Sequence, residues 1–147
     1  MSVPHLLLAW MLGSLIALLG TGDFLGGLVE DSSISASWLI PTVFLLAGAM
    51  AFATGTSWGS FGLLLPIAGG IVNALDAPEL LLPALGAVLA GAVAGDHASP
   101  ISDTTILSSM FSGCDLMDHV RTQLPYALAA AASSVLLCLV AGALALG

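Results

Sequence analysis

Basic side chains are almost absent from this 147-residue chain, in which Arg121 is the only lysine or arginine. Nine acidic residues give it a formal net charge of -8 at pH 7. A nucleic-acid-binding protein needs a basic surface, so this charge balance excludes nucleic acid as a partner. The N-terminus also lacks the basic region that precedes the apolar core of a cleaved signal peptide, and we expect the first apolar segment to stay in the protein.

Cysteine is scarce as well, since Cys114 and Cys138 are the only two. Their wide separation matches no zinc-ligand spacing and gives no basis for a disulfide framework. We expect both to be packing residues, because a free cysteine usually behaves as a small apolar side chain.

Charged residues make up only 7% of the chain, whereas 59% of its residues are hydrophobic and the mean hydropathy is +1.11. Four runs contain no charge at all. They are Met1–Gly22, Ser32–Leu75, Leu80–Gly95 and Thr122–Gly147. A helix that spans a bilayer needs about 20 mostly apolar residues. The sequence therefore predicts an all-α integral membrane protein, with one transmembrane domain over residues 1–147, no soluble domain and the lipid bilayer as its surroundings.

The apolar pattern predicts four to five membrane segments. We expect them at Val3–Leu19, Trp38–Ala53, Phe61–Leu75, Leu80–Ala94 and Thr122–Leu146. Polar connections at Glu30–Ser37 and Asp76–Glu79 are expected to face water. Trp38 is placed where an interfacial anchor belongs, and Pro41 fits the first turn of its helix, where no hydrogen bond is lost.

Two polar stretches interrupt this apolar pattern and predict broken helices. The run TGTSWGS at residues 54–60 has four hydroxyl groups and two glycines, inside a charge-free run too long for one helix. The run Gly20–Gly27 contains Asp23, and glycine permits the helix to end there. Asp23 therefore lies either at the break of a discontinuous membrane helix or in a surface turn, and both interpretations stay open.

The most polar part of the chain is the run GDHASPISDTT at residues 95–105, which holds two carboxylates, a histidine and four hydroxyls. A charge in a bilayer costs about 2.5–3.5 kcal/mol on insertion scales, so acids between apolar segments are functional candidates by default. Pro100 is expected to interrupt any helix between Asp96 and Asp103 and to leave carbonyl groups unpaired beside them. We expect the longer stretch Gly95–Val120 to form a re-entrant hairpin with an oxygen-rich pocket.

Oxygen ligands of this kind suit a hard cation, and we expect Asp96 and Asp103 to bind Na+. Hydroxyl groups from the polar runs at residues 54–60 and 95–105 are the expected ligands or hydrogen-bonding supports. They belong to Ser99, Ser102, Thr104, Thr105, Thr56 and Ser57. His97 and Asp23 are candidates for a proton relay or a supporting role, and His97 could equally orient Asp96 or cap a helix. We expect no catalytic residue and no cofactor.

Three runs resemble the C-terminal half of the NhaC-type Na+/H+ antiporters. They are ATGTSWGSFG (residues 53–62), GDHASPISDTTILSS (95–109) and GCD with DHVRTQLPY (113–115 and 118–126). The resemblance implies a multi-pass secondary transporter of the bacterial inner membrane, built from two inverted halves, which exchanges Na+ for H+. A missing N-terminal half or a second copy of the chain is then the expected partner. Exchange of an organic acid (malate/lactate-like) or an amino acid, coupled to Na+ or H+, is the alternative that the family suggests.

Two other classes of function stay open. An intramembrane hydrolase would use Asp96, His97 and Ser99, but adjacency in sequence is not the geometry of a catalytic triad and no G-x-S-x-G elbow is present. A non-transporting assembly subunit or an inactive fragment would instead depend on pairs of glycines four residues apart, which let helices approach closely. These pairs are Gly22 with Gly26, Gly55 with Gly59, and Gly91 with Gly95.

Overall fold

The computed structural model describes residues 36–146 and a set of separate positions nearer the N-terminus. Those positions are Leu7, Met11, Ser14, Leu15, Leu18, Leu19, Gly20, Thr21, Phe24, Leu25 and Gly27. Gly20 has a left-handed φ of 64°, which agrees with the helix end expected there. The predictions for Asp23 and for the polar residues 30–35 lie outside the described residues.

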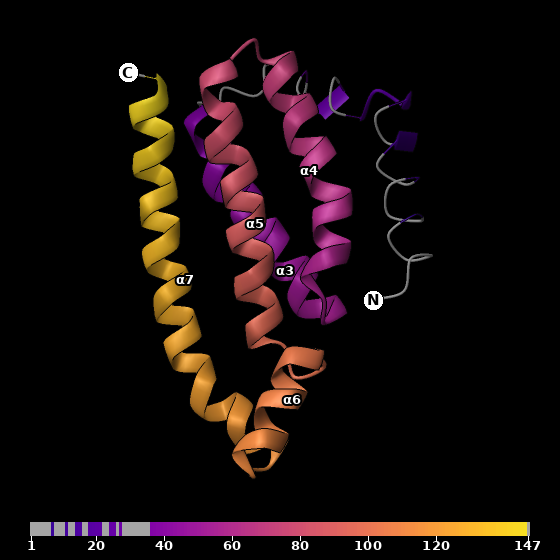
Figure 1. Ribbon diagram of the computed structural model, residues 1–147. Coiled ribbons are helices and arrows are strands. Elements are labelled where there is room, and N and C mark those ends of the chain that lie inside the picture. Colours follow the sequence, from indigo (N-terminus) through magenta and orange to yellow (C-terminus); the bar gives the residue numbers. More distant parts are fainter. Residues whose placement is uncertain are drawn as a thin grey trace.

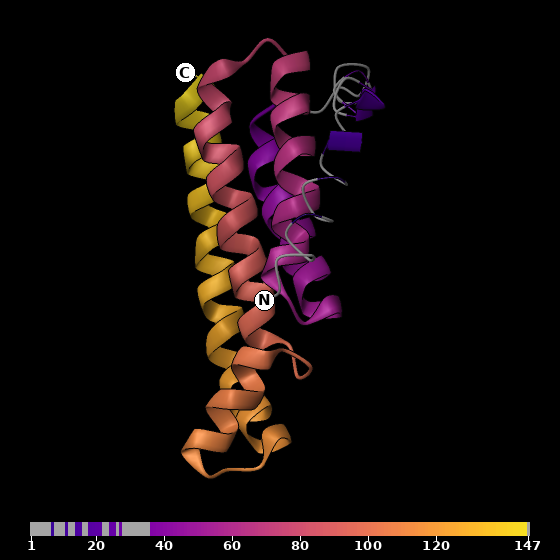
Figure 2. The ribbon, with the colours of Figure 1, turned by 45° about the vertical axis from the view of Figure 1, so that its right-hand side comes forward.

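The elements from residue 36 onward are all helical. In chain order they are η1 (Ala36–Trp38), α3 (Leu39–Thr54), α4 (Ser57–Ala74), η2 (Pro78–Leu80), α5 (Leu81–Ala98), α6 (Asp103–Ser112) and α7 (Leu116–Leu146). Figures 1 and 2 show α3, α4, α5 and the C-terminal part of α7 side by side in a bundle. Helix α6 continues past the end of α5, and the chain then turns back into α7 (Figure 1).

Four helical segments in the described part are long and apolar enough to cross a bilayer. They are Ala36–Thr54, Ser57–Ala74, Pro78–Ala98 and Leu116–Leu146. Large apolar side chains such as Leu46, Leu89 and Leu137 are exposed on the outside of the bundle, as expected of a surface that faces lipid. The predicted class, an all-α multi-pass membrane protein, is confirmed.

The core is built mainly from the contact between α3 and α5, which approach each other backbone to backbone. A methyl group added at Gly91 would overlap the carbonyl oxygen of Phe44, and one added at Gly95 would overlap that of Gly48. The close approach predicted for this glycine pair is therefore present. Small residues such as Ala47 leave room for it, and lipid-exposed helices gain most of their association energy from such packing.

The ends of α5 and α7 differ from the sequence prediction. Helix α5 does not end at Ala94 but continues to Ala98, so Asp96 and His97 are helical. The residue before a proline is pushed out of the helical region, and Ser99, before Pro100, accordingly has extended backbone angles (φ -76°, ψ 131°). Helix α7 begins at Leu116 and not at Thr122, because its polar first turns are helical, and Pro125 is accommodated inside it.

Helix α6 and the first turns of α7 form a helical hairpin where a re-entrant hairpin was predicted; its position relative to a bilayer stays a prediction. Gly113, with a φ of 65°, ends α6. The carboxylate Oδ1 of Asp115 then accepts a hydrogen bond from the amide of Met117 at 2.8 Å and caps the start of α7. Arg121 is exposed, and within the described residues it forms no ion pair with Asp115 or Asp118.

Candidate functional site

The break between α3 and α4 lies against the break between α5 and α6. Gly55 follows α3 with a φ of 69°, and a Cβ atom there would lie 2.8 Å from the carbonyl oxygen of Ile101. Ser99 donates a hydrogen bond through Oγ to the carbonyl oxygen of Phe52, in the last turn of α3, at 2.7 Å. The polar stretches at residues 54–60 and 95–105, far apart in the sequence, are thus joined in space.

Asp96 is the buried carboxylate of this region, with 6% of its surface exposed. The hydroxyl of Ser102 donates to its Oδ1 at 2.6 Å. Because Ser102 has a single hydroxyl proton, Thr104 must be the donor in the 2.7 Å contact between its Oγ1 and the Oγ of Ser102. The amide of Thr104 also donates to the Oγ of Ser102, at 3.2 Å, so one hydroxyl both caps α6 and fixes the position of Asp96.

Two further hydroxyls tie the helix ends together. Ser99 and Thr105 are both buried, and Thr105 donates through Oγ1 to the carbonyl oxygen of His97 at 3.2 Å. Their protons are therefore directed at backbone carbonyls, at the end of α3 for Ser99 and of α5 for Thr105. What these side chains can offer a cation is an oxygen lone pair.

The other predicted ligands lie at different depths. Asp103 is exposed in the first turn of α6, where a negative charge interacts favourably with the helix dipole. Thr56 and Ser57 lie at the start of α4, and Ser57 is buried while Thr56 is half-buried. The structure therefore separates the two predicted carboxylates into one that is buried and one that faces outward.

His97 is exposed, and its Nδ1 donates to the carbonyl oxygen of Val93 at 2.9 Å within α5. Ser99 points to Phe52 and Asp96 to Ser102, so in the described part of the chain these three residues form no nucleophile–base–acid relay. The geometry that an Asp96–His97–Ser99 hydrolase would need is not present.

Two buried side-chain atoms of the described residues have no hydrogen-bond partner. They are the Oγ of Ser60 in α4 and the Oε1 of Gln123 in α7. Both were inside motifs recognised in the sequence, but neither was predicted as a ligand. The signal for Ser60 was its spacing, since a residue three positions after Ser57 lies on the same face of a helix.

The donor set of the region suits an alkali cation and not a transition metal. No group of three or more His, Cys, Asp or Glu side chains lies together anywhere in the described part of the chain. Asp96 instead accepts a hydrogen bond from the hydroxyl of Ser102, which also contacts the hydroxyl of Thr104, and neutral hydroxyl oxygens are hard ligands. One negative charge beside such oxygens matches a monovalent ion.

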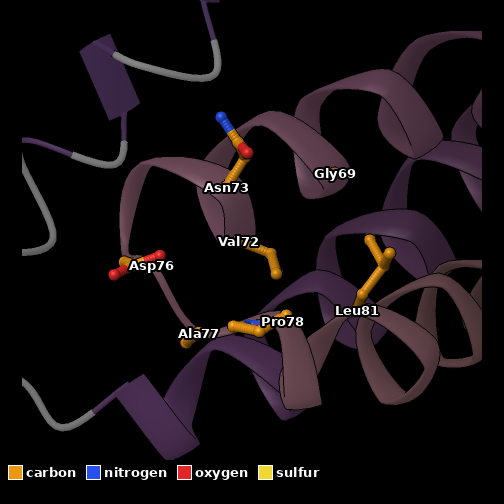
Figure 3. A pocket seen from close by; sticks show the side chains of 7 residues that line it. All are labelled: Gly69, Val72, Asn73, Asp76, Ala77, Pro78 and Leu81. Atoms are coloured by element: carbon orange, nitrogen blue, oxygen red, sulfur yellow. The ribbon is translucent and has the colours of Figure 1, made fainter.

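A separate pocket of about 260 Å³ lies at the opposite end of the bundle, where α4 connects to α5. It is lined by Gly69, Val72, Asn73, Asp76, Ala77, Pro78 and Leu81. Figure 3 shows the apolar side chains of Val72, Pro78 and Leu81 towards its middle, with Asn73 and Asp76 at its edge. Asp76 is exposed in a turn, as the sequence predicted, and we assign no ion site there.

The contact between the two breaks can be tested with a pair of glycines. We expect Gly55→Ala to destabilise the protein more than Gly113→Ala, although both glycines have the same left-handed backbone, with φ of 69° and 65°. The backbone strain, about 1–2 kcal/mol, is common to both, but only Gly55 faces a neighbour, the Ile101 carbonyl. Thermal unfolding in detergent, followed by circular dichroism, measures the difference; equal losses would mean that the breaks are not in contact.

Comparison with known proteins finds relatives for nearly the whole chain. Residues 2–143 match the model of the Na+/H+ antiporter family. An uncharacterized protein of Haemophilus influenzae is 50% identical over 96% of this chain and 27% of its own length. The malate-2H(+)/Na(+)-lactate antiporter of Bacillus subtilis is 37% identical over 90% of this chain and 29% of its own. The Na(+)/H(+) antiporter NhaC of Alkalihalophilus pseudofirmus is 37% identical over 61% of this chain and 19% of its own.

The chain thus spans less than a third of the length of each of these relatives. No solved structure matches it. The matched positions include both helix breaks and the hairpin between α6 and α7, which are the parts that carry the polar side chains. The chain belongs to the Na+/H+ antiporter family.

Proposed function

We propose that the two joined helix breaks form the cation site of a secondary transporter that exchanges Na+ for H+. The observation that supports this most directly is Asp96, a buried carboxylate fixed by the hydroxyl of Ser102 in the middle of an apolar bundle. An ionisable group is costly to place within a bilayer, so a buried carboxylate there is a functional candidate by default. The family to which the chain belongs is one of antiporters.

The exchange follows from competition at one carboxylate. Ser102 bonds Oδ1 of Asp96, and within the described residues nothing else donates to this carboxylate, so Oδ2 can take either a proton or Na+. A proton and Na+ would bind the same carboxylate oxygen, so the site holds one of them at a time. Binding of Na+ therefore releases the proton, and binding of the proton releases Na+. Asp103, exposed at the start of α6, is placed to attract the cation to the entrance.

The depth of the site agrees with this role. Helix α7 has 31 residues, which at 1.5 Å per residue is about 46 Å, close to the roughly 40–45 Å of a bilayer with its headgroups. Asp96 lies in the last turn of α5, and α6 continues beyond the end of that helix, so the break lies within the length of the molecule and not at its tip (Figure 1). Transporter sites formed by discontinuous helices lie at such breaks, near the bilayer midplane.

Alternating access needs a second element that moves against this bundle. Since the relatives are several times longer than this chain, we propose that the working transporter contains further helices. A second copy of this chain or a separate half would supply them, in a bacterial inner membrane. Only 6% of the most apolar stretch of α7 is buried in the bundle, and its exposed side offers the surface for such an assembly.

A second candidate function is exchange of an organic acid or an amino acid coupled to Na+ or H+. The relative from Bacillus subtilis is named for malate and lactate, and it matches 90% of this chain. The same cation site would then couple Na+ or H+ to the movement of a carboxylate.

The test is Na+-dependent proton movement in liposomes that contain the purified chain. An inward Na+ gradient should move protons outward, choline in place of Na+ should not, and the half-saturating Na+ concentration should fall as the pH rises because protons compete less. Proton movement that is the same with choline would contradict Na+/H+ exchange. Exchange of labelled lactate without any response to Na+ alone would favour the second candidate.

A further inference from the structure

Helices α4 and α6 both begin in the joined breaks, but only one of them is capped. The first turn of α6 has Asp103, and Ser102 accepts a hydrogen bond from the Thr104 amide. The first turn of α4 has neither an acidic residue nor a side-chain cap, so the amides of Ser57, Trp58 and Gly59 have no side-chain acceptor. Free amides at a helix N-terminus bind anions, since the helix dipole is positive there.

Ser60 lies in the same turn and is an independent sign of a ligand. Its side chain is fully buried and its Oγ has no hydrogen-bond partner. Several hydroxyls in the helices bond the carbonyl four residues back, as Ser108, Ser133 and Ser134 do, but Ser60 does not. Helical side chains lean toward the N-terminus, so this hydroxyl lies over the first turn of α4, beside the free amides.

We propose that the first turn of α4, with the hydroxyl of Ser60, binds the carboxylate group of a small anionic substrate. The proposal rests on the second candidate function, exchange of an organic acid or an amino acid coupled to Na+ or H+, and names the chemical group by which that substrate would be held. Arg121 is the only lysine or arginine, and it is exposed at the start of α7. An anion bound at the first turn of α4 would therefore be held by backbone amides and other neutral donors such as the hydroxyl of Ser60, and not by a lysine or an arginine.

The proposed anion site lies at the level of Asp96. Gly55 faces Ile101, and from this contact α4 and α5 run side by side in antiparallel directions (Figures 1 and 2). Ser60 is five residues after Gly55, and Asp96 is five residues before Ile101. The two side chains are therefore at similar heights along the neighbouring helices. An ionised Asp96 would repel a carboxylate bound on the neighbouring helix, and Na+ on Asp96 would remove that repulsion. The anion should therefore bind more tightly in Na+ than in choline.

Gly59 keeps the site open on its outer side. A methyl group there would meet only the Cγ2 of Thr56, at 3.7 Å, so packing does not require glycine at this position. Trp58 and Gly59 are exposed, whereas Ser57 and Ser60 are buried. The turn is thus closed on the side of Ser60 and uncovered on the side of Gly59, where an anion can approach the amides.

The test is calorimetric titration of the full chain in lipid nanodiscs with sodium acetate and sodium L-lactate, using sodium chloride at equal concentration as the ionic control. We expect saturable binding of a carboxylate but not of chloride, weaker in choline. Ser60→Ala should lower the affinity about tenfold, as the loss of one hydrogen bond to a charged group, and Gly59→Ala should lower it similarly. Ser133→Ala and Gly69→Ala are the matched controls and should change it less than about twofold.

A purely structural Ser60 predicts the opposite result. Removal of a buried hydroxyl that has no partner should then stabilise the fold and leave carboxylate binding unchanged. That outcome, equal heats with chloride, or no saturable carboxylate binding would overturn the proposal. Titration of the same samples with sodium methanesulfonate tests the cation site separately from the anion site. If Na+ binds and this binding depends on Asp96, the cation site is supported even when no carboxylate binds to α4. If Na+ does not bind, the cation site itself is refuted.

Discussion

Gly95→Ala is expected to lower the free energy of unfolding by about 3 kcal/mol or more, the upper part of the range for overpacking a core. The added methyl group would overlap the backbone carbonyl oxygen of Gly48, which cannot move without shifting α3. The helices must therefore separate along the contact that forms most of the core. Thermal unfolding in detergent, with size-exclusion chromatography as a check on aggregation, measures the loss.

The control for this prediction lies on the same helix. Gly86 is exposed in α5, and a methyl group there meets nothing within 4 Å. Gly86→Ala should stabilise α5 by about 0.5–1 kcal/mol, because alanine has the higher helix propensity. If Gly95→Ala were as stable as Gly86→Ala, the backbone contact between α3 and α5 would be wrong, and with it the position of Asp96 one residue further on.

The sequence predicted the membrane class and both helix breaks because each has a strong local cause. Gly55 takes a backbone conformation that favours glycine, and Pro100 forces Ser99 out of the helix. The end of α5 and the start of α7 were placed wrongly because no strong local signal marks them. Charged and polar side chains such as Asp96 and Asp118 do not stop a helix, and polarity was taken as the sign of a loop.

The candidate site was predictable as a set of residue types but not as an arrangement. Asp96 and Asp103 are equivalent in the sequence, yet one is buried by α5 packing and the other begins a new helix and faces outward. The unpartnered hydroxyl of Ser60 depends on which face of α4 meets its neighbours, and that is a property of the packed bundle. Only tertiary structure distinguishes these positions.

Asp96→Asn is expected to reduce Na+-dependent proton movement to that of protein-free liposomes. Asparagine keeps the size of the side chain and can still accept the hydrogen bond from Ser102, so the fold should survive. It has neither the negative charge that holds Na+ nor a proton to exchange, and both directions of transport stop. Ser102→Ala should leave transport in place but weaken Na+ about tenfold, since the hydrogen bond that positions the carboxylate is lost.

The two carboxylates of the motif make this prediction decisive. Asp118, exposed in the first turn of α7, is the control, and Asp118→Asn should transport as the unchanged chain does. Asp103→Asn should keep the maximal rate and raise the half-saturating Na+ concentration, because an exposed charge attracts the ion without binding it. The difference from the unchanged chain should become smaller at high ionic strength, where this attraction is screened. Loss of transport in Asp103→Asn together with activity in Asp96→Asn would reverse the assignment and would move the site from the buried break to the open end of α6. The geometry favours the first result, since of these two carboxylates Asp96 is the one that is buried, fixed by a hydroxyl and close to both breaks.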